Sequence, residues 1–250
     1  MSNLTTKGYF DQDGVKSKFN ELLGERSTAF ITSVMQVVAN NTKLKTAEPA
    51  SIYNAAAMAA VLDMPINNNL GFAYIVPYGN KAQFQMGYKG FIQLAIRSGQ
   101  YKTIGSTPIY NGQLMSSNPL TGYEFDFKVP ANGKPIGYAA SFKLHSGFEK
   151  TIYMTAAEVL AHAQKYSKSF SHSTSIWKKD FEGMANKTVL KRLISKYGPL
   201  SLEMQKAVSS DQAVVKDFEK EEFHYPDNTS ENDEETQDIN AEFVDDEPIV

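Results

Sequence analysis

The order of helical and strand patterns along this chain of 250 residues predicts an α+β fold. Apolar residues recur at helical spacing in the first quarter of the sequence. The middle alternates polar and apolar residues between turns that contain glycine and asparagine, and helical spacing returns after residue 155. With 42% hydrophobic residues the chain can bury one sizeable core, so we expect a single folded body of about 200 residues.

Three helices are expected in the first quarter, over residues 14–23, 28–40 and 49–62. Gly24 would end the first helix. Pro49 suits the first turn of the third helix, because a proline there leaves no N–H unpaired. The third helix contains the small apolar run NAAAMAAVLDM, which predicts close packing against its neighbours.

A β-hairpin is expected next, with strands at about 72–78 and 82–87 joined by Gly79-Asn80. A helix over 88–98 follows and ends at Gly99, a residue that readily adopts the left-handed conformation of a helix end. Further strands are predicted at about 103–110, 123–129, 136–144 and 149–153.

The last third of the body predicts helices again. Thr155 and Glu158 have the spacing of a capping box and open a helix that runs to about residue 167. The Ser-rich segment 167–175 is typical of a mobile loop. Two final helices are expected at 176–197 and 200–209.

Charge is divided unevenly along the chain. Residues 1–216 carry 24 Lys and Arg against 14 Asp and Glu, whereas residues 217–250 carry one basic residue against 14 acidic ones. The overall charge of −3 hides this division. The excess of positive charge in residues 1–216 indicates that this part binds a polyanionic partner. We expect a binding domain over 1–210 and an acidic tail over 211–250, disordered beyond Asp217 because apolar residues become sparse.

The composition disfavours several other classes of protein. No stretch approaches the roughly 18 apolar residues of a spanning helix, and the N-terminus lacks an apolar signal core, so we expect no membrane partner. The absence of cysteine excludes disulfides, thiolate nucleophiles and cysteine-ligated zinc, and it fits a reducing cytoplasm. The histidines are too scattered for metal-ligand spacing.

A first block of candidate binding residues lies between residues 81 and 102, where cations, amides and aromatic rings occur without a carboxylate. On the predicted helix, Lys89, Gln93 and Arg97 fall at i, i+4 and i+8 and form one polar stripe. Such a surface suits a sugar–phosphate chain and its bases, although a solvated helix face is the alternative. The block comprises Lys81, Gln83, Gln85, Tyr88, Lys89, Gln93, Arg97, Gln100 and Lys102.

A second block lies on the predicted helix 176–197, whose apolar residues surround most of its circumference although six cations interrupt them. Buried cations are costly unless they are paired, so they need carboxylates or external phosphates. Because the body has few carboxylates, we favour phosphates over lysines that reach out to water. The candidates are Lys178, Lys179, Lys187, Thr188, Lys191 and Arg192.

Three stretches closely resemble the phage RecT single-strand annealing proteins. They read LGFAYIVPYGNKAQFQ, GYKGFIQLAIRSGQYK and WKKDFEGMANKTVLKRLISKYGPLSLEMQKAV. The likeness extends over roughly residues 15–210 in the same order. It implies a small antiparallel sheet with a β-hairpin, flanked by helices that line a basic DNA groove and similar in core to the lambda Red beta annealing proteins.

The resemblance also implies a function. Members of that family bind single-stranded DNA, form rings or helical filaments of identical subunits, and anneal complementary strands beside a phage exonuclease. Both blocks of candidate residues would then contact DNA, in the cytoplasm of a bacterial host. The C-terminal tip, Asp245–Val250, is similar to the acidic tips of bacterial single-strand-binding proteins, which suggests a host single-strand-binding protein as a further partner.

We expect no enzyme and no nucleotide cofactor. The phosphate-binding pattern GxxxxGK[ST] is absent, and Gly133-Lys134 is followed by Pro135. Annealing needs no ATP, because base pairing supplies the free energy once cations have reduced the repulsion between strands. Mg²⁺ would then affect DNA binding only.

Two other functions remain open. Glu124, Asp126 and Lys128 resemble the last part of a metal-dependent nuclease motif, although two-metal chemistry needs a further acidic ligand. An amphipathic strand with its charges in water explains the same residues. The other alternative is passive coating of single strands, which would use the same basic surface without annealing.

Overall fold

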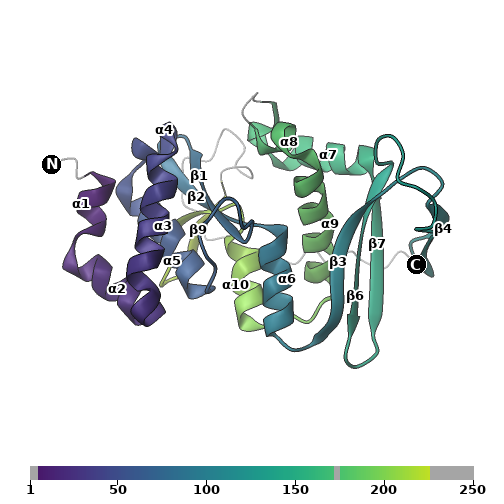
Figure 1. Ribbon diagram of the computed structural model, residues 1–250, viewed down its shortest axis with the longest axis horizontal. Coiled ribbons are helices and arrows are strands. Elements are labelled where there is room, and N and C mark those ends of the chain that lie inside the picture. The colour runs from purple at the N-terminus through teal and green to yellow at the C-terminus, as the bar shows by residue number, and fades with distance from the viewer. Residues whose placement is uncertain (1–4, 172–174, 226–250) are drawn as a thin grey trace, which may run out of the picture.

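The computed structural model describes residues 5–171 and 175–225, and it confirms the α+β fold. Figure 1 shows α1–α5 at one end of the long axis, strands β3, β6 and β7 at the other, and α6, α9 and α10 between them. The helices are α1 (Thr6–Phe10), α2 (Asp13–Leu23), η1 (Gly24–Arg26), α3 (Ser27–Ala39), α4 (Thr42–Lys45), α5 (Pro49–Val61), α6 (Tyr88–Arg97), α7 (Ala156–Tyr166), η2 (Lys168–Ser171), α8 (Ile176–Lys179), α9 (Phe181–Tyr197) and α10 (Leu202–Ser210). The strands are β1 (Ala73–Tyr78), β2 (Lys81–Met86), β3 (Tyr101–Ile109), β4 (Leu114–Asn118), β5 (Gly122–Phe125), β6 (Gly137–Leu144), β7 (Glu149–Thr155), β8 (Val214–Asp217) and β9 (Glu222–His224).

The alanine-rich helix α5 is the centre of the N-terminal part. All six residues from 55 to 60 are buried, as the run of small side chains predicts. Because alanine has almost no side chain, neighbouring elements can approach the helix closely. Strands β2 and β8 and helices α1 and α2 all pack against it, so α5 connects the N-terminal helices to the strands near the C-terminus.

The predicted hairpin forms from β1 and β2, with Tyr78 opposite Lys81 across the Gly79-Asn80 turn. After β2, the chain turns into α6 through Gly87 and Gly90. A Cβ atom at Gly87 would meet the carbonyl oxygen of Gly71, and one at Gly90 would meet that of Phe72. The two glycines are therefore required by close backbone contact, which holds the start of α6 against the segment before β1.

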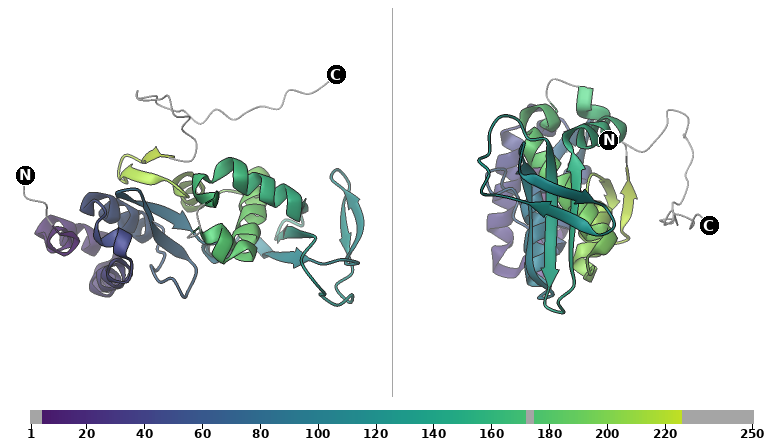
Figure 2. Two further views of the ribbon diagram at one scale, coloured as in Figure 1. Left: turned by 90° about the horizontal axis from the view of Figure 1, so that it is seen from above. Right: turned by 90° about the vertical axis from the view of Figure 1, so that its right-hand side faces the viewer.

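Strands β3, β6 and β7 form an antiparallel sheet in that order. Helix α9 packs against all three strands on one face, beside α7. The β4–β5 hairpin lies on the other side of this sheet (Figure 2), where Tyr123 contacts Tyr153 of β7 with ring centroids 5.9 Å apart. Strand β4 was not predicted, and β5 is shorter than the expected strand at 123–129.

The predicted helix 176–197 is interrupted at Asp180. This residue has non-helical backbone angles, φ −145° and ψ 69°, and its side chain accepts a 2.9 Å hydrogen bond from the N–H of Gly183. Aspartate is a strong N-cap, so Asp180 begins a new helix, α9, instead of continuing α8. The capping box at Thr155 and Glu158 is confirmed at the start of α7.

The folded body extends beyond the predicted boundary at residue 210. Asp211 is buried, and β8 and β9 form an antiparallel hairpin. The chain just before β8 is joined to β2, because the N–H of Phe84 donates to the carbonyl oxygen of Ala213 and the N–H of Gln212 donates to that of Phe84. The boundary was wrong because the apolar residues Ala213, Val214 and Val215 give this short stretch enough surface to bury. The disorder expected after Asp217 was wrong for residues 218–225, which include strand β9. Residues 226–250 lie outside the described residues, as do 172–174 of the predicted loop.

Candidate nucleic-acid interface

A cavity of about 520 Å³ opens on the polar side of α9 and is here called the α9 cavity. Four of the six residues in the second block line it, and α7 and α10 contribute to its walls. These four are Lys187, Thr188, Lys191 and Arg192. Their other neighbours in the wall include His162, Tyr166, Trp177, Ser195, Asp211 and Tyr225.

The buried carboxylate of Asp211 anchors two of these lysines. Lys187 Nζ lies 2.8 Å from Asp211 Oδ1, and Lys191 Nζ lies 2.9 Å from Oδ2. The N–H of Met86 donates a further 2.9 Å hydrogen bond to Oδ1. The inference that Lys187 lacks a carboxylate and needs a phosphate was therefore wrong, because Asp211 was assigned to the tail.

The α9 cavity nevertheless has an excess of positive charge, with three cations facing one carboxylate. Arg192 is exposed, and its guanidinium has no ion pair within residues 5–171 and 175–225. Burial alone would raise the pKa of Asp211, but the neighbouring lysines outweigh burial and hold that pKa below its usual range. The site therefore combines a buried, ionised carboxylate with an exposed guanidinium that has no ion pair among the described residues, an arrangement that favours an anionic ligand.

His162 brings a titratable group into the same wall. Its ring lies against that of Tyr166, with centroids 4.7 Å apart. Burial lowers the pKa of His162, and the charges of Arg192 and Lys191 lower it further. The imidazole is therefore neutral at pH 7, and an anion bound beside it would favour its protonation.

In the first block, Gln83 is buried, contrary to the prediction that it faces DNA. It is 3% exposed, and its side-chain amide donates to the carbonyl oxygen of Gln212. Its own amide oxygen accepts a 2.9 Å hydrogen bond from half-buried Gln85. The alternation along β2 suggested an exposed face, but the chain around residue 212 covers it.

Arg97 has protein partners where a phosphate was expected. Its guanidinium donates to the Leu62 carbonyl oxygen at 2.6 Å and to Glu203 at 3.3 Å, and it lies 3.5 Å from Asp63. It thereby connects the end of α5 to α6 and to the start of α10. This role is structural and makes Arg97 a weak candidate for DNA contact.

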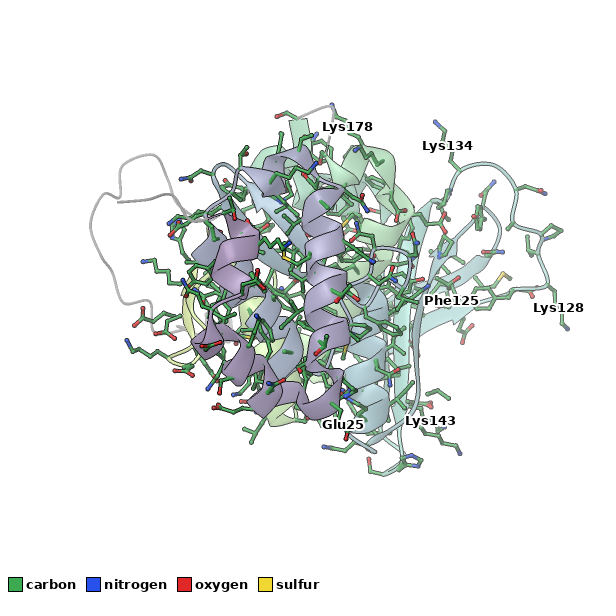
Figure 3. The ribbon with its side chains drawn as sticks, turned by 60° about the vertical axis from the view of Figure 1, so that its left-hand side comes forward. Glu25, Phe125, Lys128, Lys134, Lys143 and Lys178 are labelled. Atoms are coloured by element: carbon green, nitrogen blue, oxygen red, sulfur yellow. The ribbon has the colours of Figure 1, made fainter. Side chains whose placement is uncertain are left out.

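The remaining candidates are spread over several elements. The exposed cations Lys81, Lys89, Lys102 and Lys179 have no ion pair in the described part of the chain. Lys178 donates to the Ser171 carbonyl oxygen and projects outward at the edge of the molecule (Figure 3). Tyr88 and Gln93 are half-buried on α6, and Gln100 is exposed after it. Thus the α9 cavity gathers one compact group, whereas the first block forms no single site.

The residues of the possible nuclease motif lie on β5 and in the loop that follows it. Lys128 projects from the loop after β5 (Figure 3), and its backbone N–H donates to Asp126 at 2.9 Å. In the described ranges, no three or more His, Cys, Asp or Glu side chains come together in a way that could hold a metal ion. The further acidic ligand of two-metal chemistry is therefore not found among these residues. Likewise, no helix in the described ranges is long and apolar enough to span a membrane.

Sequence reasoning missed Asp211, His162 and Tyr225 as neighbours of the basic residues, whereas Trp177 was already part of the predicted helix 176–197. The three missed residues come from three separate elements or loops, so neither spacing nor periodicity relates them to α9. The apolar run after Asp211 was the one available signal, because it indicates a strand that would bring the carboxylate into the fold.

Comparisons with known proteins agree on one family. A model described as the RecT family matches residues 28–226. The protein YqaK of Bacillus subtilis is 50% identical over 205 residues, which cover 82% of this chain and 71% of the relative. Protein RecT of Escherichia coli is 27% identical over 230 residues, which cover 85% of this chain and 82% of that protein.

Proposed function

This chain belongs to the RecT family, and on that premise we propose that it binds single-stranded DNA and anneals complementary strands in homologous recombination. The proposal is supported by one structural observation above the others. Lys191 and Arg192 stand at a cavity with an excess of positive charge, and Thr188 lies beside them. Such a site can bind phosphates whatever the sequence of the bases.

Annealing in this proposal requires neither ATP nor a catalytic residue. The protein would reduce the repulsion between two strands and hold them until base pairing releases a more stable duplex. Mg²⁺ would act on DNA binding alone. Passive coating of single strands is the second candidate, because the same cations could bind a strand without promoting pairing.

The proposal includes the partners implied by the family resemblance. These are a second copy of the chain in a ring or filament, a phage exonuclease that generates single strands, and a host single-strand-binding protein, all in the bacterial cytoplasm. Side-by-side subunits are needed because a body of this size covers only a few nucleotides. The N-terminal helices α2 and α3 supply apolar side chains for the contact between copies. Phe19, Leu23 and Val34 are buried in the core, so the contact would use the partly exposed Leu22, Phe30 and Val37.

The test is a fluorescence assay with two complementary oligonucleotides, run without ATP and followed by a gel. We expect the protein to accelerate pairing and to leave both strands intact. Tight binding without acceleration would favour passive coating, and shortened strands that require Mg²⁺ would favour a nuclease. Arg192→Gln should slow annealing, whereas Lys196→Gln is the matched control, because Lys196 is exposed on the same helix but does not line the cavity.

A further inference from the structure

The first part of the acidic C-terminal run is attached to the body by ion pairs. Glu219 lies 2.5 Å from Lys18 of α2, and Glu221 lies 2.8 Å from Lys206 of α10. Both contacts connect carboxylates of the β8–β9 turn to cations on helices of the body. The basic body therefore already binds carboxylates of its own C-terminal region within the described residues.

The part of the chain that the structure describes ends at the α9 cavity. Tyr225, the last described residue, lines the cavity, and its hydroxyl donates to the carbonyl oxygen of Ser209. Residues 226–250 follow directly and contain ten Asp and Glu but no Lys or Arg. The first of these carboxylates, Asp227, is two residues from Tyr225, a reach of at most about 7 Å.

The cavity offers more hydrogen-bond donors than acceptors. Lys187 and Lys191 each use one N–H on Asp211, and Arg192 has no ion pair in the described ranges. The indole N–H of Trp177 is buried and finds no hydrogen-bond partner among the residues that the structure describes. Because an ionised carboxylate only accepts hydrogen bonds, it complements this set of donors in both charge and geometry.

We propose that the α9 cavity binds the chain's own acidic segment, residues 226–250. Because the segment is attached at the cavity, its effective concentration there is on the order of millimolar, so even weak carboxylate contacts keep the site occupied. The binding itself is independent of the proposed function. Its consequence, competition with single-stranded DNA for the same cations, rests on the proposed function.

Trp177 allows this to be tested in the full-length protein. It is the one tryptophan of the chain and it lines the cavity, so its emission reports on the site. The natural chain is compared with a full-length variant in which the ten acidic residues of 226–250 are changed to Asn or Gln. We expect the two proteins to differ in Trp177 emission at low salt and to converge at 1 M salt, where the Debye length is about 3 Å.

A synthetic peptide of residues 226–250, which contains no tryptophan, is then added to the neutralised variant. It should restore the emission of the natural chain, and its affinity should fall about tenfold with Arg192→Gln, as expected for one lost charge-assisted hydrogen bond. Lys196→Gln should leave peptide binding unchanged. Identical emission of the natural and neutralised chains, with no response to the peptide, would overturn the proposal.

DNA binding is measured separately, so that the two proposals can fail independently. If both hold, the neutralised variant binds a single-stranded oligonucleotide more tightly than the natural chain at low salt, and the difference disappears at high salt. Peptide binding without any effect on DNA affinity supports the acidic segment in the cavity and places DNA elsewhere. Peptide binding by a protein that binds no DNA contradicts the proposed function alone.

Discussion

Asp211 lies 2.8 Å from Lys187, and the two side chains form a buried ion pair between the end of α10 and the middle of α9. Removing one partner of such a pair leaves an uncompensated buried charge, which is far more costly than the loss of a surface pair. The ion pair has two consequences for the structure. It holds α9 in place, and it positions Lys191 and Arg192 at the opening of the cavity.

Asp211→Asn should reduce the free energy of unfolding by about 3–5 kcal/mol, the usual cost of breaking a buried pair. Urea denaturation followed by circular dichroism measures this change. Asp217→Asn is the control, because Asp217 pairs with Lys220 at the surface, where water and salt screen the pair, so its loss should have a much smaller effect. Equal effects of the two substitutions would show that Asp211 does not anchor α9.

The stabilisation by Asp211 should depend on pH in a defined direction. Its pKa in the folded protein is lower than in the unfolded chain, where it is about 3.9. The contribution is therefore fully present above pH 3.9 and is lost as the pH falls through the folded pKa. Urea denaturation between pH 3 and 7 measures the free energy of unfolding of the natural chain and of Asp211→Asn. The difference between the two free energies should narrow below about pH 3.9. A constant difference would contradict the assigned protonation.

His162 should make DNA binding stronger in mild acid. Its folded pKa lies below the ordinary value of 6.5, so it is neutral in the free protein near pH 7. A bound phosphate would raise that pKa, and by linkage the affinity should increase as the pH falls below 6.5. Fluorescence anisotropy of an oligonucleotide with the natural chain and with His162→Gln measures this. Parallel pH profiles of the two proteins would place the phosphates away from His162.

Gly90→Ala should destabilise the protein although alanine favours helices. The new Cβ would meet the carbonyl oxygen of Phe72, and the resulting shift should cost about 1–3 kcal/mol. Gly14→Ala in α2 is the matched control, because nothing lies within 4 Å of its new Cβ. That variant should gain about 0.4–1 kcal/mol. Thermal and urea unfolding of both variants test the prediction, and a stabilised Gly90→Ala protein would refute the close backbone contact.

Arg97 and Lys89 should differ in their effect on DNA binding. Lys89→Gln should reduce the slope of log affinity against log salt by about 0.7, the value for one phosphate contact on a single strand. Arg97→Gln should lower stability and leave the slope unchanged, because its guanidinium contacts Leu62, Asp63 and Glu203. If Arg97→Gln instead has normal stability and a smaller slope of log affinity against log salt, Arg97 contacts DNA.

Local signals in the sequence were sufficient for most elements. Pro49 and the alanine run predict α5, Gly79-Asn80 predicts the β1–β2 turn, and Thr155 with Glu158 predicts the start of α7. Each signal acts within a few residues, through backbone conformation or a capping hydrogen bond, so it can be recognised without knowledge of the fold. Strand β4, with the sequence LMSSN, has no alternation of polar and apolar residues and was missed for that reason.

By itself, the sequence also determined the basic character of α9 and the acidic character of the C-terminal run, because charge is a property of composition. The tertiary structure decided which of those charges are free. Asp211 lies 24 residues after Lys187, and Gln212 lies 129 residues after Gln83, so no local pattern relates the members of either pair. Burial depends on which distant segments pack together. Packing gave Lys187 a carboxylate partner, covered Gln83, and left Arg192 at the cavity without an ion pair to any described residue.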